Sequence, residues 1–429
     1  MRFQIAGNKA HPHMALISCV LYTCAEMLQG DVEKALRLYG QALQLILSWQ
    51  RQSSIASETA SVAKDMTPLL IRLGAAISIT TNCSPEGLSE LLAVPNDSRF
   101  SSLEAAQTAI LKLTSESLIL RRVVAQHKRQ GHNGSSTMFD WTVQQCSLMR
   151  QLNEWDCSFA FLRSAEGHPY LDFPYQRVIP ILLAIRSSAS IIISICFAEQ
   201  EVVYDRHMDQ FRSIVEHAAA AIRGDIDRDD DAQSEFTFEA DVGPPLFFTA
   251  VKCRDKIVRQ TALELLRQAP KVQSLFKCMS WATLAETIIQ IEEGSVEGIR
   301  ERQPLNHTAS DITTLENRTK CSLNHTTGGL DNPRGALPST ESVPSLAELV
   351  EVNNIYSDKW STGSSVHRRQ YIPEVHRVHE FNIFQARGTA PVAMSQQMQH
   401  SVILRFANNK GDPKNGRLEL EEHFLPLSF

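Results

Sequence analysis

The sequence predicts a mainly α-helical fold, an irregular superhelix of helical hairpins with a small antiparallel β element near its C-terminus. Three observations lead to this prediction. Apolar residues recur at helical spacing through most of about the first 300 positions. Capping residues, prolines and glycines mark where helices begin and end. Toward the end of the chain the pattern changes to an alternation of apolar and polar residues, which is typical of strands.

The first predicted element is a helical hairpin over residues 14–50. It consists of Met14–Leu28, a turn at Gly30 and Val32–Trp49. Its second half, GDVEKALRLYGQALQLI, resembles the second helix of a tetratricopeptide repeat, in which small alanines admit a partner helix and Tyr39 fills the groove between them. No second copy follows at the period of about 34 residues that such repeats have. The segment therefore predicts one packed helix pair.

The same periodicity predicts further helices at 55–80, 102–128, 137–165, 175–200 and 206–223, and later at Trp281–Glu293. Ser101 followed by Glu104 has the spacing of a capping box and marks one helix start. The run Ile179–Ala198 is the one candidate for a membrane span. Because Arg186 at its centre would be costly in lipid, a buried core helix is predicted and a membrane is not expected as a partner.

The stretch PPLFFTAVKCRDKIVRQTALELLRQAP, residues 244–270, has the clearest helical design. Two prolines begin a short apolar helix, and Asp255 is placed to cap a second helix that ends at Pro270. The apolar face of this second helix is expected to consist of Ile257, Val258, Ala262, Leu265, Leu266 and Ala269. The polar residues expected to face outward are Lys256, Arg259, Gln260, Glu264, Arg267 and Gln268. Asp255 and Arg259 have the spacing of an exposed ion pair.

Composition shifts divide the chain into five parts. They are a helical body at 1–223, an acidic linker at 224–243, a helical continuation at 244–300, a disordered insertion at 301–345 and a C-terminal segment at 346–429. The insertion is rich in Asn, Thr, Ser, Gly and Pro and lacks the apolar content to fold alone. Within the last part, strands are predicted at 375–384, 401–406 and 417–424, the last two joined by a turn around 408–416.

Charge and cysteine content narrow the classes of function. The 429 residues carry a formal charge of −6 without the clustered basic excess of a non-specific nucleic-acid binder. The nine cysteines are an odd number spread along the chain, which is typical of reduced thiols in an intracellular protein. The basic group of Arg121, Arg122, Lys128 and Arg129 lies near a predicted helix C-terminus, where the helix dipole favours cations. His367–Arg369 could be part of a nuclear import signal.

Few residues of the sequence have the spacing of known catalytic or metal-binding motifs. The sequence holds none of the familiar hydrolase, dinucleotide, P-loop or metalloprotease motifs, so the chain is predicted not to be an enzyme; a triad assembled in space is left open. The metal candidates weighed were Cys19 with Cys24, His11 with His13, His376 with His379, and Asp225 with Asp227 and Asp229. Each departs from known ligand spacings, so no catalytic, cofactor-binding or metal-binding residues are predicted.

Four segments carry a resemblance to a known family. They are HPHMALISCVLYTCAEMLQGD (11–31), residues 244–270, LAETIIQIEEG (284–294) and IPEVHRVHEFNIF (372–384) with the hairpin after it. With them, the chain from about His11 to Phe424 resembles the regulatory region of fungal binuclear zinc-cluster (six-cysteine) transcription factors. The resemblance implies an α-helical regulator of transcription in the nucleus that acts through protein partners of the transcription machinery. An effector ligand and a homodimer are left open.

The sequence departs from this family in two places. In the family an N-terminal cluster of six cysteines holds two zinc ions and presents a basic helix to DNA. No two cysteines here have C-x-x-C spacing, so the chain as given is expected to begin inside the regulatory half, to need no cofactor and to reach DNA only through an upstream module. After Pro270, Lys271–Phe276 replaces the basic, glycine-tryptophan segment of similar proteins. The alternative prediction is a helical-repeat interaction scaffold with no role in transcription, and an uncharacterised enzyme is a more distant one.

Overall fold

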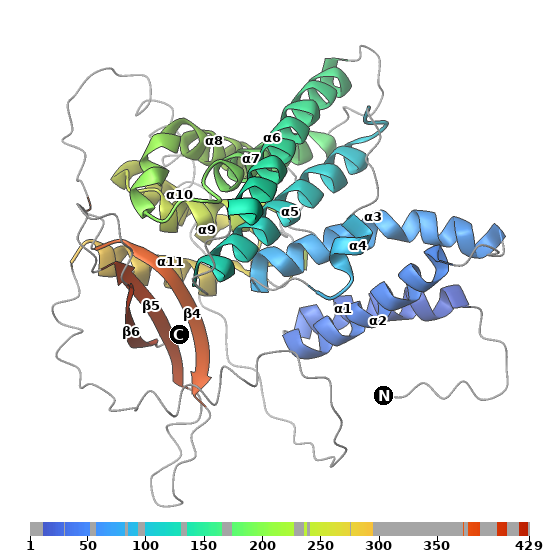
Figure 1. The fold of residues 1–429 in the computed structure, drawn as a ribbon, viewed down its shortest axis with the longest axis horizontal. Coiled ribbons are helices and arrows are strands. Elements are labelled where there is room, and N and C mark those ends of the chain that lie inside the picture. The colour runs from blue at the N-terminus through green and yellow to red at the C-terminus, as the bar shows by residue number, and fades with distance from the viewer. Residues whose placement is uncertain are drawn as a thin grey trace, which may run out of the picture. The chain divides into compact units, whose positions relative to one another are not determined.

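A computed structural model of the chain confirms the mainly α-helical fold with a small antiparallel sheet near the C-terminus (Figure 1). The structure describes residues 12–29, 31–51, 57–81, 85–92, 99–129, 135–164, 174–226, 236–237, 241–274, 276–294, 372, 376–386, 401–409 and 420–427. The predicted insertion at 301–345 lies outside these residues, as does most of the predicted turn at 408–416. All described residues belong to one compact unit.

The predicted helices are present. They are α1 (Pro12–Gln29), α2 (Val32–Gln50), α3 (Ser57–Thr81), α5 (Leu103–Arg129), α6 (Ser135–Ser164), α7 (Pro174–Ser194), α8 (Met208–Ile226), α9 (Gly243–Lys252), α10 (Lys256–Gln268) and α11 (Cys278–Glu292). The largest difference in bounds is at α7, which stops at Ser194, short of the predicted end at 200. Two short elements were not predicted: α4 (Leu88–Leu92) and the 3₁₀ helix η2 (Glu201–His207).

The predicted hairpin of α1 and α2 is confirmed, and its tyrosine reaches a third helix. Asp31 begins α2 by accepting the backbone N–H of Lys34. Tyr39 is completely buried and donates its hydroxyl proton to the carbonyl of Leu70 in α3, at 2.8 Å. Gly74 lies one turn further along α3, where an added Cβ would overlap this hydroxyl. The tyrosine therefore fixes how closely α3 packs on α2.

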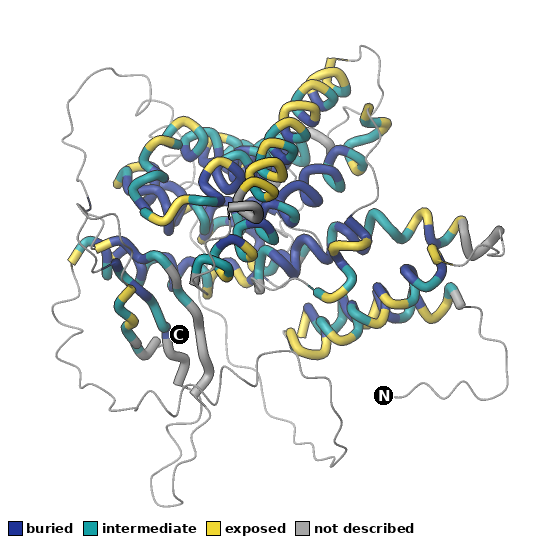
Figure 2. Tube along the Cα trace, viewed as in Figure 1, coloured by how far each residue is buried: buried dark blue, intermediate teal, exposed yellow. Residues whose placement is uncertain are grey.

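Two clusters of buried apolar side chains form the core. One is shared by α1, α2, α3 and α4. The other joins part of α3 to α5 and the later helices, and extends to Val378 and Leu404 of the C-terminal sheet. Figure 2 shows the buried residues following the inner faces of these helices while the outer faces stay exposed. The helical body and the elements after the acidic linker therefore share one core.

Helix α7 is central to the second cluster, where it packs against α5, α6, α8 and α9. Among the described residues, Arg177–Ser194 is the one helical stretch long and apolar enough to cross a membrane, and 61% of it is buried inside the molecule. Arg186 within it pairs with Asp156 of α6, at 2.8 Å from Nε to the carboxylate. The apolar character of α7 is thus accounted for by its packing, as predicted.

The C-terminal sheet has the order β4 (Val378–Ala386), β5 (Ser401–Asn409), β6 (Leu420–Leu427), antiparallel throughout. In its register Phe381 faces Phe406, and Leu404 faces Leu425. A second small sheet was not predicted. It consists of β1 (Phe236–Thr237), which lies within the expected acidic linker, then β2 (Val272–Gln273) and β3 (Phe276–Lys277). Strands of two residues leave too little periodicity to recognise in a sequence.

Candidate functional site

The turn between α9 and α10 confirms part of the expected helix design. The Asp255 side chain accepts the backbone N–H of Val258 at 3.2 Å and caps α10 as predicted. Five of the six residues expected on the apolar face are buried: Val258, Ala262, Leu265, Leu266 and Ala269. The sixth, Ile257, is 46% exposed, so its placement on that face was wrong.

Arg259 corrects the prediction for the polar face of the same helix. It was expected to face outward in an exposed pair with Asp255, but its side chain is completely buried. Its Nε donates to the carbonyl of Ala250 at 2.7 Å, and its Nη2 donates to the carbonyl of Val251 at 3.3 Å. These are carbonyls at the end of α9, which have no partner within their own helix. Arg259 therefore places a positive charge against the negative end of the α9 dipole.

Arg259 belongs to a buried ionic cluster that joins segments far apart in the sequence. We use this name for four cations and three carboxylates: Lys252, Arg254, Arg259, Arg377, Glu201, Asp205 and Glu292. Of these side chains, only that of Asp205 is substantially exposed. The members come from η2, the end of α9, the α9–α10 turn, α10, the end of α11 and the residue before β4.

Glu292 is the central acceptor of the cluster. Its Oε1 accepts from Nη2 of Arg254 at 2.7 Å and from the backbone N–H of Val378 at 2.8 Å, while its Oε2 accepts from Arg259. Burial alone would raise the pKa of the Glu292 carboxyl, but the charges of Arg254 and Arg259 and these hydrogen bonds outweigh burial and hold the pKa below its usual value. Glu292 is therefore an anion at neutral pH.

Glu201 organises the other half of the cluster. Both of its carboxylate oxygens accept from Nζ of Lys252 at 2.9 Å, and one also accepts from Arg254 at 3.2 Å. Lys252 donates in addition to the carbonyls of Val378 at 3.0 Å and His379 at 3.2 Å. Burial lowers the pKa of the Lys252 ammonium against the opposing effect of Glu201. The start of β4 is thus attached to α9 by lysine and to α11 by glutamate.

Arg377 extends these attachments to η2. Its guanidinium is completely buried and contacts the Asp205 carboxylate at 3.0 and 2.8 Å. It also donates to the carbonyls of Glu201 and Ile372. The C-terminal sheet is therefore fixed to the helical body by charged groups as well as by apolar packing.

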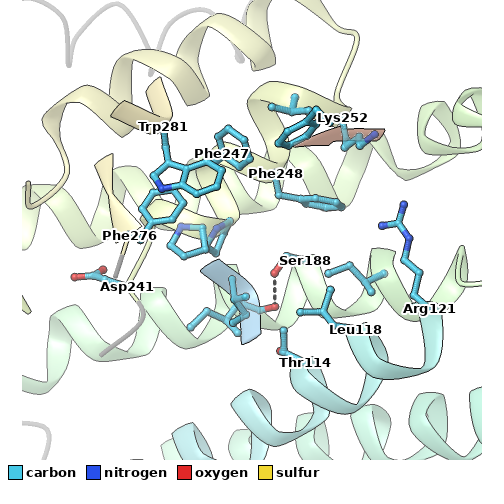
Figure 3. Close-up of a pocket in the computed structure, with 17 residues that line it drawn as sticks. Thr114, Leu118, Arg121, Ser188, Asp241, Phe247, Phe248, Lys252, Phe276 and Trp281 are labelled. Carbon is cyan, nitrogen blue, oxygen red and sulfur yellow. Dashed lines mark hydrogen bonds between the residues drawn. The ribbon is translucent and has the colours of Figure 1, made fainter. Parts of the chain in front are cut away.

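Next to the cluster lies a cavity of about 180 Å³. Its lining comes from α3, α5, α7, α9, α11, β3, β4 and Asp241, two residues before α9. Figure 3 shows aromatic side chains of α9, β3 and α11 on one side, and residues of α5 and α7 on the other. The aromatic members are Phe247, Phe248, Phe276, Trp281 and Phe381.

The aromatic wall is held by ring contacts among its own members. Trp281 is stacked on Phe276 with centroids 5.1 Å apart and ring planes 6° apart. Phe247 meets the face of Trp281 edge-on at 4.7 Å, and it also contacts Phe381 of β4 at 5.9 Å. Offset and edge-on arrangements of this kind are favourable for aromatic pairs. The wall therefore presents both faces and edges of aromatic rings, an apolar surface, to the cavity.

Few polar groups line the cavity, and they include hydroxyls, a carboxylate and two cations. The hydroxyls of Thr114 and Ser188 donate to backbone carbonyls of their own helices, the second of these visible in Figure 3. Asp241 pairs with Arg177, which neutralises the one carboxylate in the lining. Two cations line the cavity, Arg121 of α5 and Lys252 of the buried ionic cluster, and their side chains lie toward the same end in Figure 3.

The remaining candidate groups of the sequence lie on separate elements or outside the described residues. Cys19 and Cys24 are buried and half-buried on α1, and His376 is exposed. Within the described part of the chain, no three His, Cys, Asp or Glu side chains come together as a metal site would require. Lys128 contacts Glu199 at 2.8 Å and the carbonyl of Phe197. His11, His367–Arg369 and the side chains of Asp225, Asp227, Asp229 and Arg129 lie outside the described residues.

Comparisons with known proteins supply no assignment of function. No protein-family model, no curated protein and no solved structure matches this chain. The buried ionic cluster and the aromatic cavity are therefore the features from which function has to be argued.

Proposed function

We propose that the chain is the regulatory domain of a transcriptional regulator of the fungal zinc-cluster type, acting in the nucleus through protein contacts and not through catalysis. The observation that supports this is where the segments of the resemblance lie. Residues 244–270 supply Lys252, Arg254 and Arg259 to the buried ionic cluster, 284–294 supply Glu292, and 372–384 supply Arg377. Three of the four segments chosen for their resemblance thus bond to one another in space.

This arrangement supports a binding function because the charged residues of 244–270 hold structural elements together. Lys252, Arg254 and Arg259 pair with carboxylates or donate to backbone carbonyls inside the protein. Charged groups engaged in this way hold elements together, and they are not poised to exchange protons with a substrate. A regulator needs such a framework to present surfaces to partner proteins.

A tethering experiment tests the proposal. The full chain is fused to a heterologous DNA-binding domain in a fungal host, and transcription of a reporter carrying that domain's site is measured. We expect reporter transcription to rise or fall several-fold relative to the DNA-binding domain alone. A fusion that is folded, nuclear and without effect on the reporter would count against a transcriptional role and favour the interaction scaffold.

Nuclear location is tested separately, with the chain carrying a fluorescent tag and no added import signal. We expect nuclear accumulation, and we expect substitution of Arg368 and Arg369 by glutamine to reduce it. Glutamine at Arg37 and Arg150, two exposed arginines of the helical body, serves as the matched control. Exclusion of the unmutated chain from the nucleus would contradict the proposal.

A further inference from the structure

The cavity beside the buried ionic cluster has the size and lining of a ligand site. Buried apolar cavities of about 150 Å³ hold a benzene molecule, so the 180 Å³ here is enough for one aromatic ring with a short substituent. The aromatic wall offers faces and edges against which a flat ring can stack. Pockets that are largely apolar and carry a few convergent polar groups are typical of small-molecule sites.

The charged groups in the lining define the chemistry of the polar end. Asp241 is neutralised by Arg177, and Lys252 donates to Glu201 and to two backbone carbonyls of β4. Arg121 lies at the same end as Lys252. A carboxylate placed beside Arg121 would accept a charge-assisted hydrogen bond from its guanidinium inside a largely apolar cavity.

We propose that this cavity binds a small aromatic carboxylic acid, with its ring against Phe247, Phe248 and Trp281 and its carboxylate facing Arg121. The proposal goes beyond the transcriptional role and stands on the cavity alone. A ligand bound there would contact α5, α7, α9 and α11 together. It would therefore stabilise the arrangement of these helices against unfolding in proportion to its occupancy.

A matched pair of probes separates ring binding from recognition of the acid. 3-Phenylpropionate and 3-phenylpropionamide have nearly the same shape, but only the first carries a negative charge. Binding to the full chain is measured by ligand-observed NMR and by thermal unfolding. A charge-assisted hydrogen bond distinguishes the two, so we expect the acid to bind about tenfold or more tightly than the amide.

Two variants locate the bound acid. Arg121→Gln is expected to weaken binding of the acid about tenfold and to leave binding of the amide unchanged within about twofold. The side chain of Arg122 is outside the lining, so Arg122→Gln is expected to leave the binding of both probes unchanged. Trp281→Phe keeps an aromatic ring in the wall. It is expected to remove the change in intrinsic tryptophan fluorescence on binding, while NMR still detects the acid.

Each outcome of these measurements either supports or overturns the proposal. A preference for the acid that disappears in Arg121→Gln, together with a fluorescence change that requires Trp281, supports the proposal. Absence of binding of either probe at millimolar concentration overturns it. Equal binding of acid and amide shows an apolar cavity without recognition of a carboxylate and also overturns it. Binding of the acid that Arg121→Gln does not weaken, or that leaves Trp281 unaffected, places the acid elsewhere and refutes the assignment.

Discussion

Glu292→Gln is expected to destabilise the protein far more than the same change at Glu286. Both glutamates lie on α11 and accept from an arginine of α10, at 2.8 Å from Glu286 to Arg267. They differ in burial: the side chain of Glu292 is 0% exposed and that of Glu286 is 44% exposed. Burial should therefore decide the difference between the two variants.

The magnitudes follow from what each change leaves behind. Glutamine at position 292 leaves the buried guanidinium of Arg259 with backbone carbonyls and no carboxylate. Arg254 keeps Glu201 and the carbonyl of Lys252. An uncompensated charge in the interior costs about 3 to 5 kcal/mol. The pair of Glu286 and Arg267 is largely in solvent, where such pairs contribute about 0 to 1 kcal/mol.

The assay is urea unfolding at pH 7 followed by circular dichroism, with the free energy and the slope fitted for each variant. We expect Glu292→Gln to lose about 3 to 5 kcal/mol and Glu286→Gln less than about 1 kcal/mol. A double-mutant cycle with Arg259→Met should show coupling, because the two side chains contact each other directly. Losses equal within about 0.5 kcal/mol for the two glutamine variants would refute the argument.

The same variant has a defined dependence on pH. The pKa of Glu292 is lower in the folded protein than in the unfolded chain, where it is about 4.3. Its contribution to stability is therefore complete above about pH 5 and is lost as the pH falls through the folded pKa. Unfolding measured from neutral pH downward should show the stability deficit of Glu292→Gln shrinking under acid conditions. A deficit that stays constant across this range would contradict the pKa assignment.

Two further predictions concern the cores on either side of α3. Burial raises the pKa of the Cys253 thiol to about 12. Iodoacetamide at pH 8 should therefore modify the exposed Cys146 in the native protein, and Cys253 only after denaturation. Mass spectrometry of the labelled protein measures both. Early labelling of Cys253 would contradict its burial. Gly74→Ala should cost about 1 to 3 kcal/mol, since its Cβ would overlap the Tyr39 hydroxyl and lie 2.7 Å from a leucine methyl. At Gly40 an added Cβ meets nothing within 4 Å, so Gly40→Ala should not destabilise the protein. Equal losses of unfolding free energy at both glycines would contradict the packing of α2 on α3.

The helices and the C-terminal strands could be predicted because their patterns are local. Apolar residues at helical spacing give elements such as α5 and α8, and alternation gives β5 and β6. The first hairpin was found because Gly30 and the alanines around Tyr39 indicate the same structure. The short strands β1, β2 and β3 were missed because two residues are too few to show a strand pattern, and β1 in addition pairs with the distant β2.

The buried ionic cluster and the cavity were missed for the same physical reason. Glu201, Glu292 and Arg377 lie far from residues 244–270 in sequence, and no local pattern shows that they meet there. The cavity likewise draws its lining from eight different regions of the chain. Charged residues near a helix end were interpreted as solvated, which is the usual case for isolated pairs. Only the folded arrangement gives these charges their partners.

One signal in the sequence could have placed Arg259 and Ile257 correctly, and it leads to a last prediction. Arg259 is three and seven positions before Ala262 and Leu266, so all three share one face of α10, whereas Ile257 is seven positions before the exposed Glu264. Leu266→Asp, which places a charge at a fully buried position, should unfold the protein, but Ile257→Asp should change stability by less than about 1 kcal/mol. Circular dichroism and gel filtration of the two variants check this. A soluble, fully helical Leu266→Asp protein, or an unfolded Ile257→Asp protein, would show that the face of α10 assigned to the core is wrong.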